Sequence, residues 1–480
     1  MMDFGISPQI AGAAVAATVL FSLYYIYQAL ALRRRRNAFK RARGCLPAPW
    51  YPLRDPILGL DSFKEQLVAL KQKRLLEMLS GRFARSGNTM QNIALGLHVH
   101  FTMEPENLKT MQAVDFKKWG LPGRRKFAFR PLLGLGIFTT DGDDWHRSRE
   151  MLRPQFARSQ IADLPTFEKH VTHVISAIPK DGSTVNLSDL FFRLTMDSAT
   201  EFLFGESTES LTSSSEGGFA QAFTRSQFEV AGRSRWGGFA RLLPYGAHWA
   251  ADLAFVNQFV DHYVEIGVAK RQQSRGERAP EHKGRYIFLD EICQQTQDPI
   301  RIRSESLNIL LAGRDTTASL LTNVWFTLSS RPDIWAKLQK EIATLNGAIP
   351  TYAELKELKY VRSLMDESLR LYPVVPLNTR EALEDTTLPL GGGPDGTASI
   401  FIKKGESVSW SVYAMHRRKD YYGEDAEIFR PERWLDDPVS GRKGMRAGWH
   451  YLPFNGGNRI CLGQREHFRE SCEEGCNADV

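Results

Sequence analysis

The sequence is poor in cysteine. Its 480 residues include only five, at scattered positions without a repeated spacing: Cys45, Cys293, Cys461, Cys472 and Cys476. This excludes a disulfide framework and indicates that the folded part of the chain lies in a reducing compartment. It also argues against a zinc cluster, because Cys472 and Cys476 have the i, i+4 spacing of a metal pair but only His467 near them.

A strong excess of one charge is missing as well. The chain has 62 Lys and Arg against 55 Asp and Glu, a net charge of +7. The positive charge is dispersed apart from one run, and no nucleic-acid-binding motif accompanies it, so a membrane surface or an acidic protein partner fits better than nucleic acid. With 42% hydrophobic residues the chain is not disordered and is long enough to bury a large core.

The sequence contains no internal repeat, no low-complexity block and no alternation of strands with helices. Helical periodicity is visible at 63–80, 188–203, 249–271, 304–330 and 360–371. Strand-like residues gather at 92–102 and 386–412. Breaks at 212–218 and 271–285 are predicted to be surface loops. These patterns predict one large, mainly α domain with a small β region.

The amino-terminal segment 10–32 carries no charge and, as a helix, is long enough to cross the roughly 30 Å hydrocarbon layer of a membrane. Four arginines, 33–36, follow at once and place the rest of the chain in the cytoplasm by the positive-inside rule. A cleaved signal peptide is the alternative, but its charged end comes first and its apolar run is shorter. We therefore predict a lumenal segment 1–9, a transmembrane anchor 10–32 and a basic, proline-rich linker 33–54.

The stretch from Phe454 to Gly463, FNGGNRICLG, surrounds one cysteine with unusual neighbours. Glycines such as Gly457 permit close backbone approach, and Arg459 can fork onto a carboxylate. A buried thiolate needs a compensating cation or metal, and a single cysteine with one arginine suits haem, whose iron takes the sulfur and whose propionate takes the guanidinium. The alternative is a glycine-rich turn with an inert Cys461, although the five fixed positions coincide by chance with a probability on the order of 10⁻⁴.

A second motif, AGRDTT at 312–317, interrupts an apolar helical run. Glycine, aspartate and threonine are poor helix residues, so this helix departs from local preference for another reason. A hydroxyl that bonds the carbonyl one turn back can open a local groove beside the helix. The alternative is a kink with a solvent-facing aspartate at Asp315.

A third pattern pairs Glu367 with Arg370, three residues apart on one face of an apolar helix. Such a pair is worth only a few tenths of a kcal/mol on a surface. The segment FRPERW lies downstream, so Arg433 is placed to join the pair in a buried triad.

A fourth pattern, DWHRSR, places Trp145 and Arg149 at i and i+4 on one helical face, where an indole donor and a guanidinium can meet one carboxylate. Two histidines, His416 and His450, have no partners at ligand spacing and are predicted to be structural.

The cysteine loop and these motifs, in this order along the chain, resemble the cytochrome P-450 haem-thiolate monooxygenases, and the resemblance covers residues 46–464. It implies the cytochrome P-450 fold over 55–464. It also implies haem b as cofactor, with Cys461 as axial ligand of the iron and further cofactor-binding residues in the loop and around the propionates: Trp145, Arg149, Arg380, Phe454, Gly457, Arg459 and Gly463. For Arg380 a plain surface arginine remains the alternative.

The resemblance also assigns roles to the remaining motifs. Asp315 and Thr316 correspond to the catalytic acid and alcohol that deliver protons during oxygen activation. The triad of Glu367, Arg370 and Arg433 corresponds to a structural element that supports the cysteine loop.

Several stretches look narrower than the superfamily, namely DPILGLD (55–61), GIFTTDG (136–142), MLRPQF (151–156) and TLPLGGG (387–393). They resemble the fungal alkane- and fatty-acid-hydroxylating branch, which implies terminal hydroxylation of a long apolar chain by an enzyme of the endoplasmic reticulum membrane. The implied partners are O2, membrane lipid and an NADPH-cytochrome P-450 reductase, which we expect to dock on exposed basic residues of the cysteine side: Arg147, Lys443 and Arg446. Another lipophilic substrate is the alternative.

The last segment, 465–480, departs from the family pattern. A long apolar helix and a strand pair are expected there, but Phe468 is the only large apolar side chain before Val480. We predict a truncated or mis-spliced tail, so a catalytically defective membrane protein with this fold is the competing function.

Overall fold

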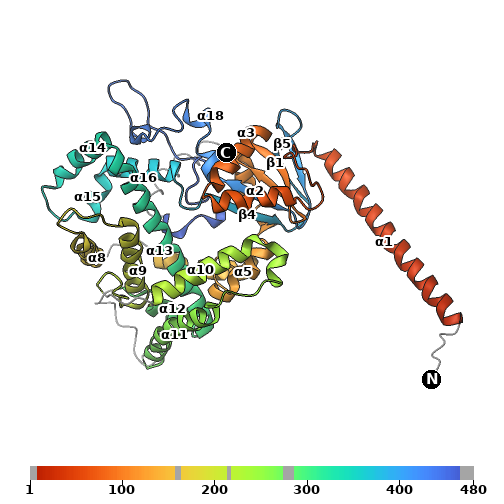
Figure 1. Ribbon diagram of the computed structural model, residues 1–480, viewed down its shortest axis with the longest axis horizontal. Coiled ribbons are helices and arrows are strands. Elements are labelled where there is room, and N and C mark those ends of the chain that lie inside the picture. Colours follow the sequence, from red (N-terminus) through yellow and green to blue (C-terminus); the bar gives the residue numbers. More distant parts are fainter. Residues whose placement is uncertain (1–7, 157–163, 213–217, 274–285, 465–480) are drawn as a thin grey trace.

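The computed structural model describes residues 8–156, 164–212, 218–273 and 286–464. The predicted tail at 465–480 and most of the predicted loops at 212–218 and 271–285 lie outside this part of the chain. The architecture is mainly helical with a small sheet region on one side, as predicted (Figure 1).

The first helix, α1 (Pro8–Ala42), is longer than the predicted anchor and continues through the four arginines (Figure 1). It projects away from the body of the protein, and its large apolar side chains are exposed, Leu20 by 67% and Tyr27 by 68%. Within the described ranges, no helix combines the length and the apolar character needed to cross a membrane. The transmembrane anchor therefore stays a prediction.

The proline-rich segment after α1 is docked on the sheet. Trp50 forms a parallel bridge with Gln91, supported by hydrogen bonds from the Tyr51 amide to the Gln91 carbonyl at 2.9 Å and from the Gln91 amide to the Pro49 carbonyl at 2.8 Å. At the end of α1, Arg36 forms a bidentate ion pair with Asp385 at 2.8 and 2.9 Å. The linker is thus fixed to the body at several points.

The predicted helix at 63–80 is wrong in one respect, because two helices occupy this region: α2 (Leu60–Lys71) and α3 (Leu75–Ser86). Lys73, in the connection, has a φ of +59°, which no α-helix accommodates. The apolar period continues across the break, so periodicity alone did not reveal it. Three short helices follow β2 along the chain: α4 (Pro105–Lys109), α5 (Gly123–Leu133) and α6 (Gly142–Leu152).

The long helix α13 (Pro299–Ser330) runs through the centre of the body (Figure 1). Asp298 caps its start, since its carboxylate accepts hydrogen bonds from the amides of Ile300 and Arg301, and Pro299 occupies the first turn where no amide is needed. The main hydrophobic core lies between α13 and its neighbours. The helices that contribute to this core include α9 (Leu187–Phe204), α10 (Phe219–Arg235), α11 (Trp249–Gln273) and α12 (Phe288–Gln295), while α8 (Leu164–Ala177) packs on α9.

A second core joins the end of α13 to α14 (Pro332–Ile342) and α16 (Lys359–Leu371) through Val324, Leu338 and Leu364. The short α15 (Tyr352–Glu357) precedes α16 and begins with a capping box between Thr351 and Glu354.

The main sheet has the strand order β1-β2-β7-β4-β3, in which only the β2–β7 pair is parallel. Its strands are β1 (Thr89–Ala94), β2 (Leu97–Thr102), β3 (Trp119–Gly120), β4 (Leu377–Ala382) and β7 (Ser407–Ser411). A separate antiparallel pair consists of β5 (Thr386–Gly392) and β6 (Ala398–Ile402). The predicted strand region 386–412 is therefore shared between two sheets. After β7 come α17 (Val412–Met415) and α18 (Lys419–Tyr422), followed by coil that leads to the cysteine loop.

Candidate functional site

The cysteine loop has a tight backbone geometry. Gly457 has a φ of +58°, and a Cβ at this position would lie 2.0 Å from the carbonyl oxygen of Gln112, so no other residue fits without movement. Gln112 also accepts a hydrogen bond from the Gly456 amide through its side-chain oxygen at 2.9 Å. The Cys461 amide donates to the Phe454 carbonyl at 3.0 Å, which closes the loop.

The Cys461 side chain is accessible to solvent, although protein atoms crowd it on most sides. This crowding raises the pKa of the Cys461 thiol, while the amides of Gly463 and Gln464 and the charge of Arg149 act in the opposite direction. A Cβ on Gly463 would make an ordinary contact of 3.8 Å with the Cys461 sulfur, so this glycine adjoins the sulfur directly. The loop thus presents one sulfur among hydrogen-bond donors, the setting that a thiolate ligand needs.

Arg459 makes an ion pair with Asp141, with 2.6 Å between Nη2 and Oδ1, and its guanidinium lies 4.5 Å from the centre of a Trp145 ring. The arginine is almost fully buried, and this burial lowers its pKa to about 10. Arg459 therefore stays charged at neutral pH. The sequence predicted that Arg459 binds a carboxylate. In the structure, one of its guanidinium nitrogens forms an ion pair with a protein carboxylate, that of Asp141.

The predicted pair, Trp145 and Arg149, lies on α6 beside the cysteine loop. Trp145 is buried, and the Arg149 guanidinium lies 5.7 Å from its ring. Arg149 donates a hydrogen bond from Nη1 to the Ile460 carbonyl at 3.0 Å. Burial lowers the pKa of Arg149, and the neighbouring Cys461 opposes that shift.

Arg380 is buried and not a surface arginine, with 5% of its area exposed. Its Nη1 donates to its own strand, to the Asn378 side chain at 3.2 Å and to the Thr379 carbonyl at 2.9 Å. Burial, together with the like charges of Arg459 and Arg125, lowers the pKa of Arg380 to about 9. Arg380 has no ion pair with a carboxylate among the residues that the structure describes.

Arg125, at the start of α5, joins this group but was missed from the sequence, where it was one of several basic residues in a GRRK run. Burial lowers its pKa, and Asp141 opposes the shift. Within the described chain, its Nε and the Nε of Arg459 are buried and have no hydrogen-bond partner. Asp141 is already shared by Arg459 and by Lys126 at 3.1 Å.

The arginine cluster formed by Arg125, Arg380 and Arg459 thus carries more positive charge than Asp141 balances. Buried guanidiniums without a carboxylate are costly unless an anion pairs with them. The residues fit haem b on this ground, because its two propionates provide the missing charge beside the one thiol that can take the iron.

On α13, the Thr316 hydroxyl donates to the Ala312 carbonyl at 2.7 Å, the back-bond anticipated from the motif. The helix continues without interruption across the motif. A Cβ on Gly313 would meet no atom within 4 Å, which leaves that side of the helix open.

Asp315 is two-thirds buried and pairs with its neighbour Arg314 at 3.1 Å. Burial raises the pKa of Asp315, and the charge of Arg314 and a hydrogen bond from Gln227 oppose this. Arg314 also donates to Thr224 at 2.8 Å and to Gln227 at 3.3 Å, both on α10. Asp315 is therefore not a fully solvent-facing residue. Arg314, to which the sequence analysis assigned no role, connects the motif to α10.

The predicted triad is present as a contact network. Glu367 and Arg370 form a bidentate pair at 2.7 and 2.8 Å, and the Nε of Arg433 lies 3.5 Å from Glu367. Both members of the first pair have no exposed side-chain area. The Glu367 carboxylate also accepts bonds from the Arg430 amide at 2.9 Å and the Trp434 indole at 3.0 Å.

His416 connects this triad to the segment that leads into the cysteine loop. Its Nδ1 bonds the Arg370 carbonyl at 3.2 Å, and its Nε2 accepts from the Leu452 amide at 2.9 Å. Complete burial lowers the pKa of His416 to about 3, so it is neutral and donates from Nδ1. His450 stacks on Tyr421 with 5.3 Å between ring centres. These contacts fit the structural role predicted for both histidines.

The three basic residues expected to meet a reductase are exposed: Arg147 by 68%, Lys443 by 83% and Arg446 by 62% of their side chains. Each has an acidic neighbour. Arg147 pairs with Asp144 at 3.5 Å, while Lys443 and Arg446 share Asp436 at 3.7 and 2.8 Å. Because two basic side chains, Lys443 and Arg446, share the single Asp436 carboxylate, this group of three residues has a net positive charge.

A fold of this kind, with one thiol in a glycine-rich loop and a buried arginine cluster beside it, defines a haem-thiolate protein. The family comparison agrees: the family model described as Cytochrome P450 matches residues 70–465, and the chain belongs to this family. Membership implies haem as cofactor, a lipophilic substrate, O2 and electrons from a reductase, usually at the expense of NADPH, and it makes the protein a monooxygenase.

Curated relatives extend over most of the chain. The cytochrome P450 monooxygenase himC of Aspergillus japonicus is 42% identical over 468 residues, which are 96% of this chain and 83% of that protein. Cytochrome P450 52A12 of Debaryomyces hansenii is 42% identical over 432 residues, 85% of this chain and 81% of that protein. A crystal structure of a cytochrome P450 (CYP102L1) has a TM-score of 0.69 over 88% of this chain and 89% of its own, at 24% identity, and supports the fold.

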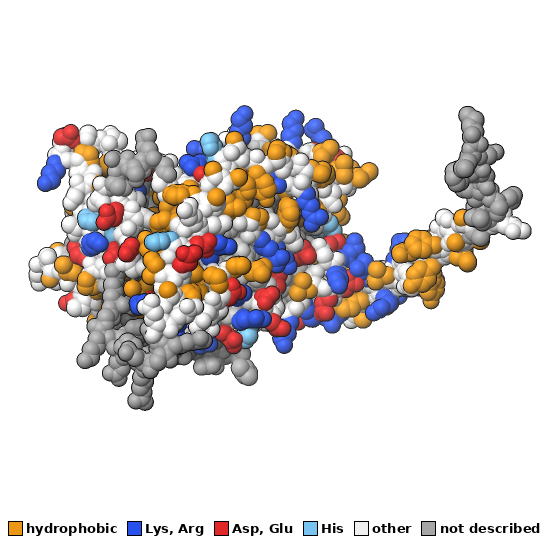
Figure 2. Space-filling model, turned by 90° about the horizontal axis from the view of Figure 1, so that it is seen from below, with side chains coloured by type: hydrophobic (Ala, Val, Ile, Leu, Met, Phe, Trp, Pro, Cys, Tyr) orange, Lys and Arg blue, Asp and Glu red, His pale blue; other side chains and the backbone are white. Residues whose placement is uncertain are grey.

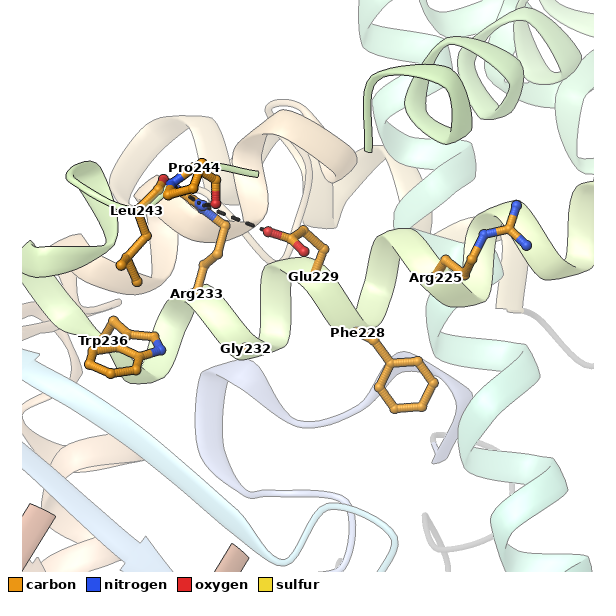
Figure 3. Close-up of a pocket in the computed structure, with 8 residues that line it drawn as sticks. All are labelled: Arg225, Phe228, Glu229, Gly232, Arg233, Trp236, Leu243 and Pro244. Carbon is orange, nitrogen blue, oxygen red and sulfur yellow. Dashed lines mark hydrogen bonds and ion pairs between the residues drawn. The ribbon is translucent and has the colours of Figure 1, made fainter. Parts of the chain in front are cut away.

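A pocket of about 410 Å³ lies on α10 and the segment after it, and contains none of the predicted site residues (Figure 3). Arg233 and Glu229 face Leu243 and Pro244, while Phe228 points to the other side of the helix. Arg233 donates to the carbonyls of Leu243 and Pro244 at 3.1 Å, so it holds this segment against α10. The pocket is a surface feature, separate from the cysteine loop.

Proposed function

We propose that this monooxygenase hydroxylates the terminal carbon of a long apolar chain, an n-alkane or a fatty acid. The observation that carries the proposal is the set of stretches that resemble the fungal alkane- and fatty-acid-hydroxylating branch. One of them, GIFTTDG at 136–142, is packed on α13. The Phe138 amide donates to the Asn308 side chain at 3.0 Å, and a Cβ on Gly136 would lie 2.3 Å from Asn308.

The same stretch supplies Asp141, the partner of Arg459. The stretch 136–142 therefore contacts both α13 and the cysteine loop. The residues that resemble the alkane- and fatty-acid-hydroxylating branch thus lie next to the proposed site. Bound haem supplies the oxidising chemistry that inserts one oxygen atom of O2 into a C–H bond while the other leaves as water.

The protein residues then have three proposed roles. Cys461 provides the thiolate ligand, and Arg125, Arg380 and Arg459 hold the propionates. Asp315 and Thr316 pass protons toward the reacting oxygen, a step that needs a hydroxyl and a titratable group. The raised pKa of Asp315 moves this carboxyl toward the range in which it takes up and releases a proton.

We also propose that α1 anchors the enzyme in the endoplasmic reticulum membrane, with the catalytic domain in the cytosol beside the reductase. Apolar side chains cover the outer part of α1, and basic side chains gather where it meets the body (Figure 2). That order favours insertion of the apolar end. Carbonate extraction of microsomes and protease protection test the anchor; release of the full chain by carbonate contradicts it.

The substrate is tested by incubating the reductase-supplemented enzyme with dodecane and with lauric acid and by locating the hydroxyl group by mass spectrometry. We expect the terminal alcohol and ω-hydroxy acid. Another lipophilic substrate is the second candidate, because several relatives at 40–42% identity are named as monooxygenases without a stated substrate. Binding spectra with lipophilic compounds of other shapes, combined with no product from either chain, would support that second candidate.

A further inference from the structure

Two histidines and a glutamate lie together where the linker after α1 contacts the sheet, away from the cysteine loop. His98 and His100 are two residues apart on β2, so their side chains leave the same face of the sheet. Glu406 directly precedes β7, which pairs in parallel with β2. Its carboxylate lies 2.8 Å from His98 Nδ1 and 3.1 Å from His100 Nε2.

The hydrogen bonds of His98 fix which ring nitrogen carries its proton. Gln91 donates from Nε2 to the Ala48 carbonyl at 2.5 Å, so its side-chain oxygen faces His98 Nε2 at 3.0 Å. That contact requires a proton on Nε2. In the neutral imidazole, Nδ1 is then a bare lone pair facing a carboxylate oxygen, an arrangement that a cation between the two atoms makes favourable.

The other two groups also present metal-binding atoms to one another. The His100 ring, whose side chain is 3% exposed, faces the Glu406 carboxylate through Nε2 at 3.1 Å. The Glu406 carboxylate faces both imidazoles, so a bound cation would replace these two contacts. Metal ligands must be neutral imidazoles and ionised carboxylates.

We propose that His98 Nδ1, His100 Nε2 and the Glu406 carboxylate form a binding site for one divalent cation of the zinc type. The ligand atoms all lie within 4.8 Å of one another. Tetrahedral zinc with bonds of about 2.0–2.1 Å sets its ligands roughly 3.3 Å apart, so small side-chain shifts suffice. Two nitrogen ligands exclude calcium and magnesium as the preferred ions.

The surroundings of His98 supply contacts that a zinc site needs beyond its ligands, whereas His100 Nδ1 is buried without a hydrogen-bond partner in the described chain. Gln91 accepts the remaining His98 N–H, the type of contact that orients metal-bound imidazoles. Trp50 stacks on the His98 ring at 5.0 Å. The His98 side chain is 26% exposed, so water can reach the fourth position. Lys403, 3.4 Å from Glu406, competes for the carboxylate but is half exposed and free to turn away.

A cation at this site would join β2, the turn before β7 and, through Gln91 and Trp50, the linker that follows α1. The site is independent of the proposed substrate, since none of its residues belongs to the haem-binding or proton-delivering groups.

The experiment is zinc titration of the purified full-length holoenzyme, freed of metal with EDTA, by calorimetry. We expect one zinc per chain and an X-ray absorption spectrum with two imidazoles and oxygen ligands. His98→Gln and Glu406→Gln should each weaken binding at least 100-fold, and Gln91→Ala by about 10-fold. His98 and Glu406 are partly exposed, so these variants are expected to fold, which the haem spectrum checks.

The matched control is His146→Ala, which removes an exposed histidine paired with Glu150 at 3.0 Å and should leave zinc affinity unchanged. Equal zinc binding by wild type, His98→Gln and Glu406→Gln would overturn the proposal, and so would the absence of stoichiometric binding by wild type.

Discussion

Replacement of Glu367 by glutamine is the sharpest test of the buried triad. The change keeps the size of the side chain but removes its charge and turns one acceptor into a donor. In the native protein both carboxylate oxygens are occupied, by Arg370 at 2.7 and 2.8 Å and by further donors from the Arg433 segment. Breaking a fully buried pair by removing one partner costs about 3–5 kcal/mol, because the other charge is left uncompensated.

That loss is a large fraction of the roughly 5–15 kcal/mol that stabilises a domain. We expect Glu367→Gln to lower the urea midpoint for loss of helical circular dichroism strongly and to reduce haem retention, because the same network holds the coil that leads to Cys461. Glu106→Gln is the control. It removes an acid from an i, i+3 pair with Lys109 on a helix, but this pair is 4.0 Å long and about half exposed, so the expected loss is below about 1 kcal/mol.

The reasoning is refuted if Glu367→Gln and Glu106→Gln have the same urea midpoint. It is also refuted if Glu367→Gln loses stability but Glu367→Ala loses none, since the penalty is assigned to an unpaired Arg370 and both variants leave it unpaired.

Four further predictions follow from single sites. Cys461→Ala should abolish the thiolate band of the reduced carbon monoxide spectrum and Cys293→Ala should not; a band that survives the first change disproves the ligand assignment. Thr316→Ala should bind haem normally but release more peroxide per NADPH consumed, and unchanged coupling would place proton delivery elsewhere. The pKa of about 3 for His416, below the ordinary 6.5, means that its stabilising contribution is complete above pH 6.5 and declines by up to about 1.4 kcal/mol per unit as pH falls toward 3; a urea midpoint whose pH dependence is the same in wild type and His416→Asn would contradict this. Lys443→Glu should raise the reductase concentration for half-maximal turnover at low salt and lose that effect at high salt, whereas a salt-independent effect would rule out an electrostatic contact.

Local sequence patterns predicted much of this protein because the determinants are local. Gly457 and the other loop glycines are adjacent in sequence to Cys461, and the threonine back-bond on α13 spans one helical turn. The helices predicted at 188–203, 249–271, 304–330 and 360–371 begin and end within about five residues of α9, α11, α13 and α16, because their apolar periodicity is strong, whereas α8 and α10 were not predicted. The break between α2 and α3 was missed because the period continues across a turn that only Lys73, in a left-handed conformation, reveals.

The arginine cluster marks the limit of such reasoning. Arg125, Asp141, Arg380 and Arg459 come from four separate segments, and no spacing in the sequence indicates that they meet. Arg125 was overlooked because, in sequence, a basic run at a helix start usually means a solvated surface. Its importance becomes visible only when the sheet brings Arg380 beside the cysteine loop and Asp141 proves to be already shared with Lys126.

The same cluster explains why fold and cofactor binding depend on each other in this protein. Three buried guanidiniums lie beside one shared carboxylate; burial lowers the pKa values of Arg380 and Arg459, and the like charges of neighbouring arginines lower them further. The fold tolerates the unfavourable free energy of these buried charges because other contacts hold α5, β4 and the cysteine loop in place. The triad and His416 are among these contacts. On the proposed assignment the haem propionates would remove the charge imbalance, so part of the free energy of haem binding would come from relief of this repulsion. On this argument the three arginines stabilise the haem-bound protein more than the haem-free protein. Such an arrangement is expected of residues that serve cofactor binding and not the fold.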